Sequence, residues 1–175
     1  MATITRTWVA FAAIGVGLIH VALVIGSPLG LGIPLAVLGL TEFGWGVLAF
    51  ARESIPVPRV ALVVALVPVL GWSLLLAAGS ASEDPTLAGA LPLLPLAVAA
   101  LFEFFIVAVI GIGLRRGRDA SSPPPGVARY LISLMVGALA VAALTTPALA
   151  ATEAGVYAVP HGEHTGLFNL PDHSH

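Results

Sequence analysis

The sequence has few charged residues and lacks several residue types altogether. It contains no cysteine and no lysine, and charged residues make up 9% of its 175 residues. The absence of cysteine excludes a disulfide framework, a zinc knuckle and a thiolate site. A soluble domain carries about 25% charged residues because its surface faces water, so this composition excludes a soluble globular enzyme. With a net charge of −2, the chain lacks the excess of positive charge that is typical of nucleic-acid-binding proteins.

Apolar residues dominate the chain: 58% of it is hydrophobic and its mean hydropathy is +1.04. Such a chain is too apolar to be disordered, and we interpret it as an all-α integral membrane protein. A helix needs about 20 mostly apolar residues to cross the hydrocarbon core. Five stretches qualify, and their short connectors predict that consecutive spans are antiparallel neighbours. The predicted spans are 8–25, 31–50, 60–79, 91–114 and 130–150, within a membrane bundle of residues 1–150 that is followed by a tail of residues 151–175.

The arginines predict the orientation of the chain, because Lys and Arg are enriched in cytoplasmic loops next to membrane spans. In a five-span arrangement every arginine falls on one side, whereas the opposite connectors carry no basic residue. We therefore expect a cytoplasmic N-terminus and an extracytoplasmic tail. The composition, rich in Ala, Val, Leu, Gly and Arg, favours a bacterial plasma membrane. The arginines are Arg6, Arg52, Arg59, Arg115, Arg116, Arg118 and Arg129.

An internal repeat relates the second and fourth predicted spans. The second span reads PLAVLGLTE from Pro34 to Glu42, and the fourth reads PLAVAALFE from Pro95 to Glu103. Both spans run from outside to inside, so the pattern predicts a parallel repeat of helix pairs, spans one and two against spans three and four. Repeats in transporters often place a binding site at the repeat interface. Chance similarity is the alternative, because Leu, Ala and Val are common in this chain.

Three ionisable residues, His20, Glu42 and Glu103, lie within the predicted spans. A charge at the bilayer centre costs about 2.5–3.5 kcal/mol on insertion scales, so such residues usually face the protein interior. Each glutamate follows a repeat proline by eight residues, about 12 Å along a helix, so we expect both carboxyls at similar depth. We expect His20 a helical turn or more closer to the outside. Small neighbours, including Gly17 and Gly39, predict closely packed helix faces here.

Two interpretations of these three residues remain open. In the first, they form an intramembrane relay for a proton or a cation, with Glu42 and Glu103 as acceptors and His20 as a gate or ligand. In the second, the two glutamates are protonated acids that form hydrogen bonds to neighbouring helices, because burial disfavours their charged form.

The C-terminal tail is rich in histidine: four of the five histidines lie in the last fifteen residues, in two clusters that each contain a proline and an acid. Histidine-rich tracts are typical of metal-binding segments, and imidazole with carboxylate suits zinc, copper(II) and nickel. We therefore predict that the tail binds a divalent transition metal. A solvated tail whose histidines titrate near neutral pH is the alternative. The predicted ligands are His161, Glu163, His164, Asp172, His173 and His175.

The end of the fifth predicted span resembles a cleavage site. The stretch Pro147–Ala151 has the small-residue pattern of a signal-peptidase site, and cleavage after Ala150 would release the tail. An ordinary small-residue helix end is the alternative, and we favour it in this alanine-rich chain.

Two function classes follow from these features. The first is a multi-pass membrane protein that binds or transports a metal, captured by the tail and passed to the intramembrane His and Glu residues; in this class we expect a homo-oligomer. The second is a non-catalytic accessory subunit of a larger membrane complex, whose intramembrane acids pair with partner subunits. We rank an enzyme third, behind these two classes, because the sequence contains no nucleophile–base pair, phosphate loop or dinucleotide fingerprint. Besides further copies of the chain or partner subunits, we expect the chain to contact the lipid bilayer, and we expect no nucleic-acid partner.

Overall fold

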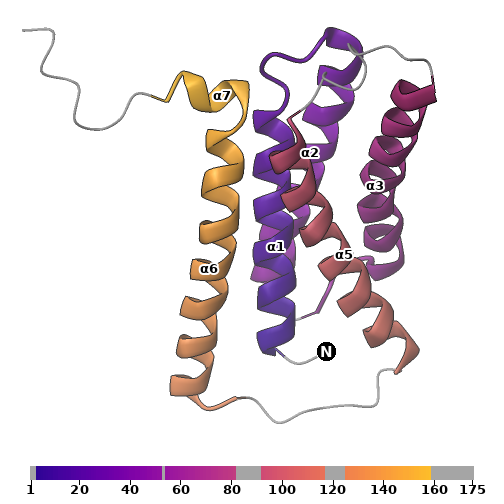
Figure 1. The fold of residues 1–175 in the computed structure, drawn as a ribbon. Helices are drawn as coiled ribbons and strands as arrows, with labels where there is room; N and C mark the ends of the chain where they lie inside the picture. The colour runs from indigo at the N-terminus through magenta and orange to yellow at the C-terminus, as the bar shows by residue number, and fades with distance from the viewer. Residues whose placement is uncertain (1–2, 53, 82–91, 117–124, 159–175) are drawn as a thin grey trace, which may run out of the picture.

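The computed structural model describes residues 3–52, 54–81, 92–116 and 125–158, and over these residues the fold is all-helical (Figure 1). Among these residues, five helices are long and apolar enough to cross a membrane, the same number as the predicted spans. A short helix, α7 (Glu153–Val156), follows the last of them. The five are α1 (Thr3–Ala22), α2 (Leu29–Ala51), α3 (Pro58–Ala81), α5 (Leu93–Arg115) and α6 (Val127–Ala150).

The first helix, α1, is the centre of the bundle. It packs against α2, α5 and α6, whereas α3 packs only against α5 among the described residues (Figure 1). In its most apolar stretch α1 has 56% of its residues buried, compared with 17% in α3 and 6% in α6. A helix that is apolar on every face, and that the rest of the protein leaves uncovered, is typical of a membrane span that faces lipid. The core therefore lies around α1, and α3 and α6 form the periphery.

Glycines bring α1 and α2 into close contact. A Cβ atom on Gly17 of α1 would lie 2.6 Å from the backbone nitrogen of Phe43, and one on Gly46 of α2 would lie 2.9 Å from the carbonyl oxygen of Ala10. Side chains at these positions would force the helices apart, because real Cβ atoms do not approach backbone so closely. The packed faces predicted from small residues are confirmed at this interface.

The first helix is shifted towards the N-terminus relative to its predicted boundaries. It begins at Thr3, where the hydroxyl of Thr7 donates a hydrogen bond to the Thr3 carbonyl, although this stretch is too polar to count as an apolar span. It ends at Ala22, although the chain stays apolar up to Ile25. Gly26 follows with a φ of +85°, a left-handed conformation that favours glycine and directs the chain out of the helix.

Consecutive helices are not always neighbours, which corrects one expectation. The described residues of α2 and α3 do not pack against each other, and Figure 1 shows α5 leaning across the bundle towards α3. The connector between α2 and α3 contains extended backbone at Arg52 and a positive φ at Val57. Six residues in extended form can reach about 20 Å, twice the 8–10 Å between packed helices. A short connector therefore does not force α3 against α2.

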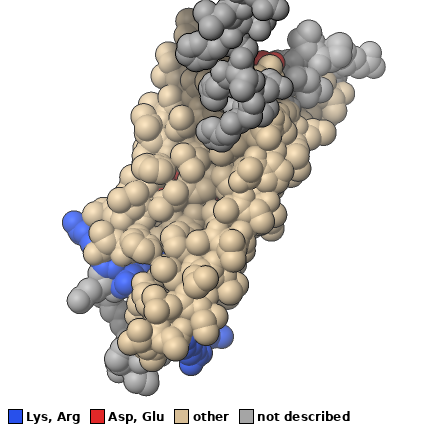
Figure 2. Space-filling model, turned by 90° about the vertical axis from the view of Figure 1, so that its left-hand side faces the viewer, with Lys and Arg blue, Asp and Glu red and all other residues tan. Residues whose placement is uncertain are grey.

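The basic side chains gather at one end of the molecule, as Figure 2 shows on one face. The described arginines lie near the start of α1, α3 and α6 and near the end of α2 and α5. This one-sided distribution is the basis of the predicted orientation. The orientation itself and the parallel repeat remain predictions.

Candidate metal centre

The central residue of the candidate site is His20, in the last turn of α1. Its side chain is completely buried, because α1 is enclosed by α2, α5 and α6. Gly17 lies one turn earlier on α1, at the closest approach to α2. The imidazole consequently lies in the core of the bundle.

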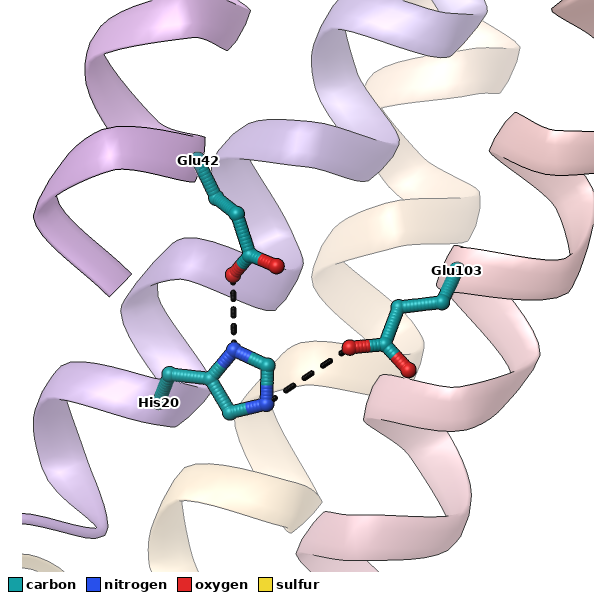
Figure 3. Close-up of side chains that lie close together, drawn as sticks. All are labelled: His20, Glu42 and Glu103. Carbon is teal, nitrogen blue, oxygen red and sulfur yellow. Dashed lines mark hydrogen bonds and ion pairs between the residues drawn. The ribbon is translucent and has the colours of Figure 1, made fainter. Parts of the chain in front are cut away.

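Glu42 of α2 is the first partner of this imidazole. Nδ1 of His20 and Oε2 of Glu42 are 2.6 Å apart and form a buried hydrogen bond (Figure 3). The close packing of Gly39 against Gly17 places the two helices near enough for such a short contact. The hydrogen bond therefore depends directly on the glycine-mediated contact between α1 and α2.

Glu103 of α5 lies on the other side of the ring. Its Oε1 atom is 3.7 Å from Nε2 of His20, and its side chain is completely buried. Ala99, one turn earlier on α5, is also completely buried, and Phe102 and Ile106 are nearly so. An apolar face of α5 thus carries a single carboxyl group into the core.

Figure 3 shows the resulting order of groups: carboxyl, imidazole, carboxyl, from three different helices. The expectation that both glutamates lie at similar depth is confirmed, since both flank the same ring. Four buried atoms of the group lack a hydrogen-bond partner among the described residues: Nε2 of His20, Oε1 of Glu42, and both carboxyl oxygens of Glu103. Buried polar atoms are rarely left unsatisfied, and such a cluster calls for an explanation such as a bound ion or water.

The predicted offset of His20 is confirmed relative to Glu42. Gly39 of α2 lies against Gly17 and Val21 of α1. The backbone of His20 is therefore about one helical turn from the level of Glu42, and the two side chains bridge that distance. α1 ends two residues after His20, whereas α2 begins thirteen residues before Glu42, which correspond to about 3 Å and about 20 Å along the helices. The connector of residues 23–28 continues beyond the end of α1 before α2 begins (Figure 1). α2 therefore starts well beyond α1, and the carboxyl group of Glu42 comes within reach of the His20 imidazole.

The three side chains could hold a metal ion. One ligand atom from each of His20, Glu42 and Glu103 can be chosen so that all lie within 4.8 Å of one another. Nitrogen and carboxylate oxygen are the ligands that zinc accepts besides thiolate. Two carboxylates and a neutral imidazole would also balance the charge of a divalent cation, which matters because an unbalanced charge is costly to bury. In both chemistry and charge, the donor set fits a divalent transition metal.

A further buried polar group lies outside the predicted site. Thr145 of α6 is 6% exposed, and its Oγ1 atom has no hydrogen-bond partner among the described residues. A Cβ atom on Gly15 of α1 would lie 3.0 Å from this hydroxyl, so the group faces the central helix. The pair Thr145-Thr146 in an apolar span was the sequence signal that could have identified it.

The predicted tail ligands lie outside the described residues, which end at residue 158. This applies to His161, Glu163, His164, Asp172, His173 and His175. Their role in metal binding therefore remains a prediction. Comparison of the chain with protein-family models, with curated proteins and with solved structures finds no match. Inference about function therefore depends on the residues themselves.

Proposed function

We propose that this chain is a multi-pass membrane protein that binds and transports a divalent transition metal ion, with a binding site inside its helix bundle. One observation carries the proposal. His20 Nε2 and Glu103 Oε1 face each other across 3.7 Å, buried and without hydrogen-bond partners among the described residues. In this proposal, His20 and Glu103 are ligands of the ion and the extracytoplasmic tail captures it.

The separation of these two atoms favours a metal over a direct hydrogen bond. An N–H···O hydrogen bond spans 2.7–3.2 Å, so 3.7 Å is too long. Two ligand atoms that each lie about 2.1 Å from a tetrahedral zinc ion are about 3.4 Å apart. The gap between His20 and Glu103 is therefore close to the spacing of two ligands of one ion.

Glu42 would orient the imidazole. Metal-binding histidines usually donate their second ring N–H to a carboxylate or a carbonyl, which fixes the tautomer and makes the ligand more basic. Here Nδ1 of His20 would donate to Oε2 of Glu42 at 2.6 Å, leaving the lone pair of Nε2 directed towards Glu103. The other oxygen of Glu42, Oε1, has no partner among the described residues and is a candidate third ligand.

The small number of protein ligands supports an exchangeable site. Structural zinc sites have four protein ligands, whereas sites with an open position keep one for water or substrate. His20, Glu42 and Glu103 offer at most three residues. An ion held in this way could enter and leave, as metal handling or transport requires. With no cysteine in the chain, zinc, copper(II) and nickel are the expected ions.

The tail is attached at the end of the bundle that is nearer to His20. α7, which leads to the tail, lies beside the end of α1, where a Cβ atom on Gly26 would meet the side chain of Glu153. His20 is in the last turn of the same helix. We propose that the tail histidines collect the ion at this end and raise its local concentration above the buried site.

Metal analysis of the purified chain tests the proposal. The protein is isolated by an affinity tag without histidine, incubated with zinc, copper(II) or nickel, desalted and measured by mass spectrometry of the metal content. We expect the chain in which His161, His164, His173 and His175 are changed to Ala to retain about one ion, and the additional change His20→Ala to remove it. Wild-type protein that retains no metal after incubation contradicts the proposal.

An accessory subunit of a membrane complex is the second candidate function. The observation that favours it is the exposure of α6 and α3, of which 6% and 17% are buried in their most apolar stretches. Such faces suit partner helices as well as lipid. Gentle detergent extraction from the native host tests this candidate: a stable hetero-complex supports it, and recovery as a monomer or homo-oligomer alone contradicts it.

A further inference from the structure

A groove of about 560 Å³ lies between α3 and α5 at the end of the bundle where the arginines gather. Its walls come from the first turns of α3, including Leu62 and Leu66, and from the last turns of α5, including Ile112. The lining is almost entirely apolar, with one charged residue, Arg115. A groove of this composition is unsuited to a polar solute and suits a hydrocarbon chain.

Gly111 opens the groove on the α5 side. A Cβ atom at Gly111 would meet no other atom within 4 Å, so the absence of a side chain leaves unoccupied space next to the helix. α3 packs only against α5 among the described residues, so no third helix covers this contact. The groove is therefore open to the surroundings of the bundle along its length.

The groove extends from the end of a span into the apolar region. Its α5 lining runs from Val107 to Arg115, eight residues or about 12 Å along the helix. One leaflet of the hydrocarbon core is about 15 Å thick, half of the whole. The groove could therefore hold most of the length of one acyl chain, with its open end at the level of the headgroups.

Arg115 supplies a positive charge at that open end. It is the last residue of α5, it is exposed, and it forms no ion pair with another described residue. The acidic residues that the structure describes are Glu42 and Glu103 in the core and Glu153 at the opposite end. A basic group next to a membrane span attracts anionic lipid headgroups.

We propose that this groove binds an anionic phospholipid, with an acyl chain against Leu62, Leu66 and Gly111 and the phosphate on Arg115. The charge at the mouth distinguishes this ligand from a zwitterionic lipid, because a guanidinium with no ion-pair partner among the described residues favours a headgroup with net negative charge. The site is independent of the metal centre in the core and shares no residue with it.

Native mass spectrometry of the full chain in detergent tests the proposal. Phosphatidylglycerol and phosphatidylcholine with identical acyl chains are added in equal amounts, and the retained lipid is counted. We expect wild type to retain phosphatidylglycerol several-fold more than phosphatidylcholine. Arg115→Gln should reduce retention of phosphatidylglycerol to the level of phosphatidylcholine, and Gly111→Leu should reduce retention of both lipids.

Two matched variants serve as controls. Arg129→Gln removes an exposed arginine at the same end of the bundle but on α6. Gly71→Leu fills another helical glycine position with no atom within 4 Å, away from the groove. Both should retain lipid as wild type does. Equal retention of the two lipids by wild type, or equal losses in Arg115→Gln and Arg129→Gln, would overturn the proposal.

Discussion

Nε2 of His20 and Oε1 of Glu103 face each other across 3.7 Å in the core of the bundle. Neither atom has a hydrogen-bond partner among the described residues, and the two come from helices that are far apart in sequence. Leaving buried polar groups unpaired costs about 1–3 kcal/mol each. We therefore expect these two facing, unsatisfied atoms to bind a ligand. A divalent metal ion matches their chemistry and their spacing.

The hydrogen bond from His20 to Glu42 predicts a graded effect of substitution at Glu42. Glu42→Gln retains an oxygen that can accept from Nδ1 but removes the negative charge that makes the imidazole a better ligand. Loss of such an outer partner typically lowers metal affinity 10–100-fold, and we expect that range for zinc. Competition with a chelator of known affinity measures it, in protein whose four tail histidines are Ala. An affinity equal to that of the parent would show that Glu42 does not act on the metal.

The glycine contact between α1 and α2 predicts a difference between two alanine substitutions. Gly17→Ala places a Cβ atom 2.6 Å from the backbone of Phe43, so the helices must separate, and we expect a loss of about 1–3 kcal/mol of stability. Gly44→Ala on α2 has no atom within 4 Å of its Cβ and should be neutral or stabilise by up to about 1 kcal/mol. Unfolding of both proteins in detergent measures the difference, and equal stabilities would contradict the close packing. Because the same contact positions Glu42 against His20, Gly17→Ala should also weaken zinc binding.

The absence of cysteine makes the predicted orientation directly measurable. Single cysteines can be introduced at Ser54, which is exposed at the arginine end, and at Ala158, which is exposed after α7. With a cytoplasmic N-terminus, a membrane-impermeant maleimide added to intact bacterial cells that express the chain should label Ala158→Cys and leave Ser54→Cys unlabelled until the cells are lysed. The reverse labelling pattern would contradict the predicted orientation and show that the tail lies in the cytoplasm.

The fold at the end of α6 predicts that the tail stays attached. Ala148 and Thr152 are almost completely buried, and the N–H of Ala151 donates to the carbonyl of Pro147, so the stretch that resembles a cleavage site is folded. Proteases prefer exposed, poorly ordered chain. The intact mass of this chain, purified from the membrane, should be 17.8 kDa, with the tail attached. A mass equal to that of a fragment ending at Ala150 would show cleavage.

The sequence alone predicted the number of long helices and the three core residues, because both depend on local rules. An apolar run of span length and an ionisable residue within it are visible without tertiary information. The arrangement of the helices was less accessible: α3 does not pack on α2, and the imidazole of His20 lies between the two glutamate carboxyls. Both depend on how the connectors run, and hydropathy does not report that.

The short helix α7 was missed although it has a local signal. Thr152 accepts a hydrogen bond from the N–H of Gly155 and precedes Glu153 in the first turn, a typical N-terminal cap with an acidic residue near the positive end of the helix. The signal is weak for a helix of four residues, because its formation also depends on contact with α1 and α6.

Calorimetric titration with zinc tests the central claim most directly. The titrated protein carries Ala at His161, His164, His173 and His175, so that heat reports the bundle alone. We predict binding of one zinc ion per chain, loss of that binding in Glu103→Gln, and retention in Glu153→Gln, which removes a glutamate outside the core. Absence of zinc binding in the parent protein, or equal binding in Glu103→Gln, would contradict a metal centre at His20, Glu42 and Glu103.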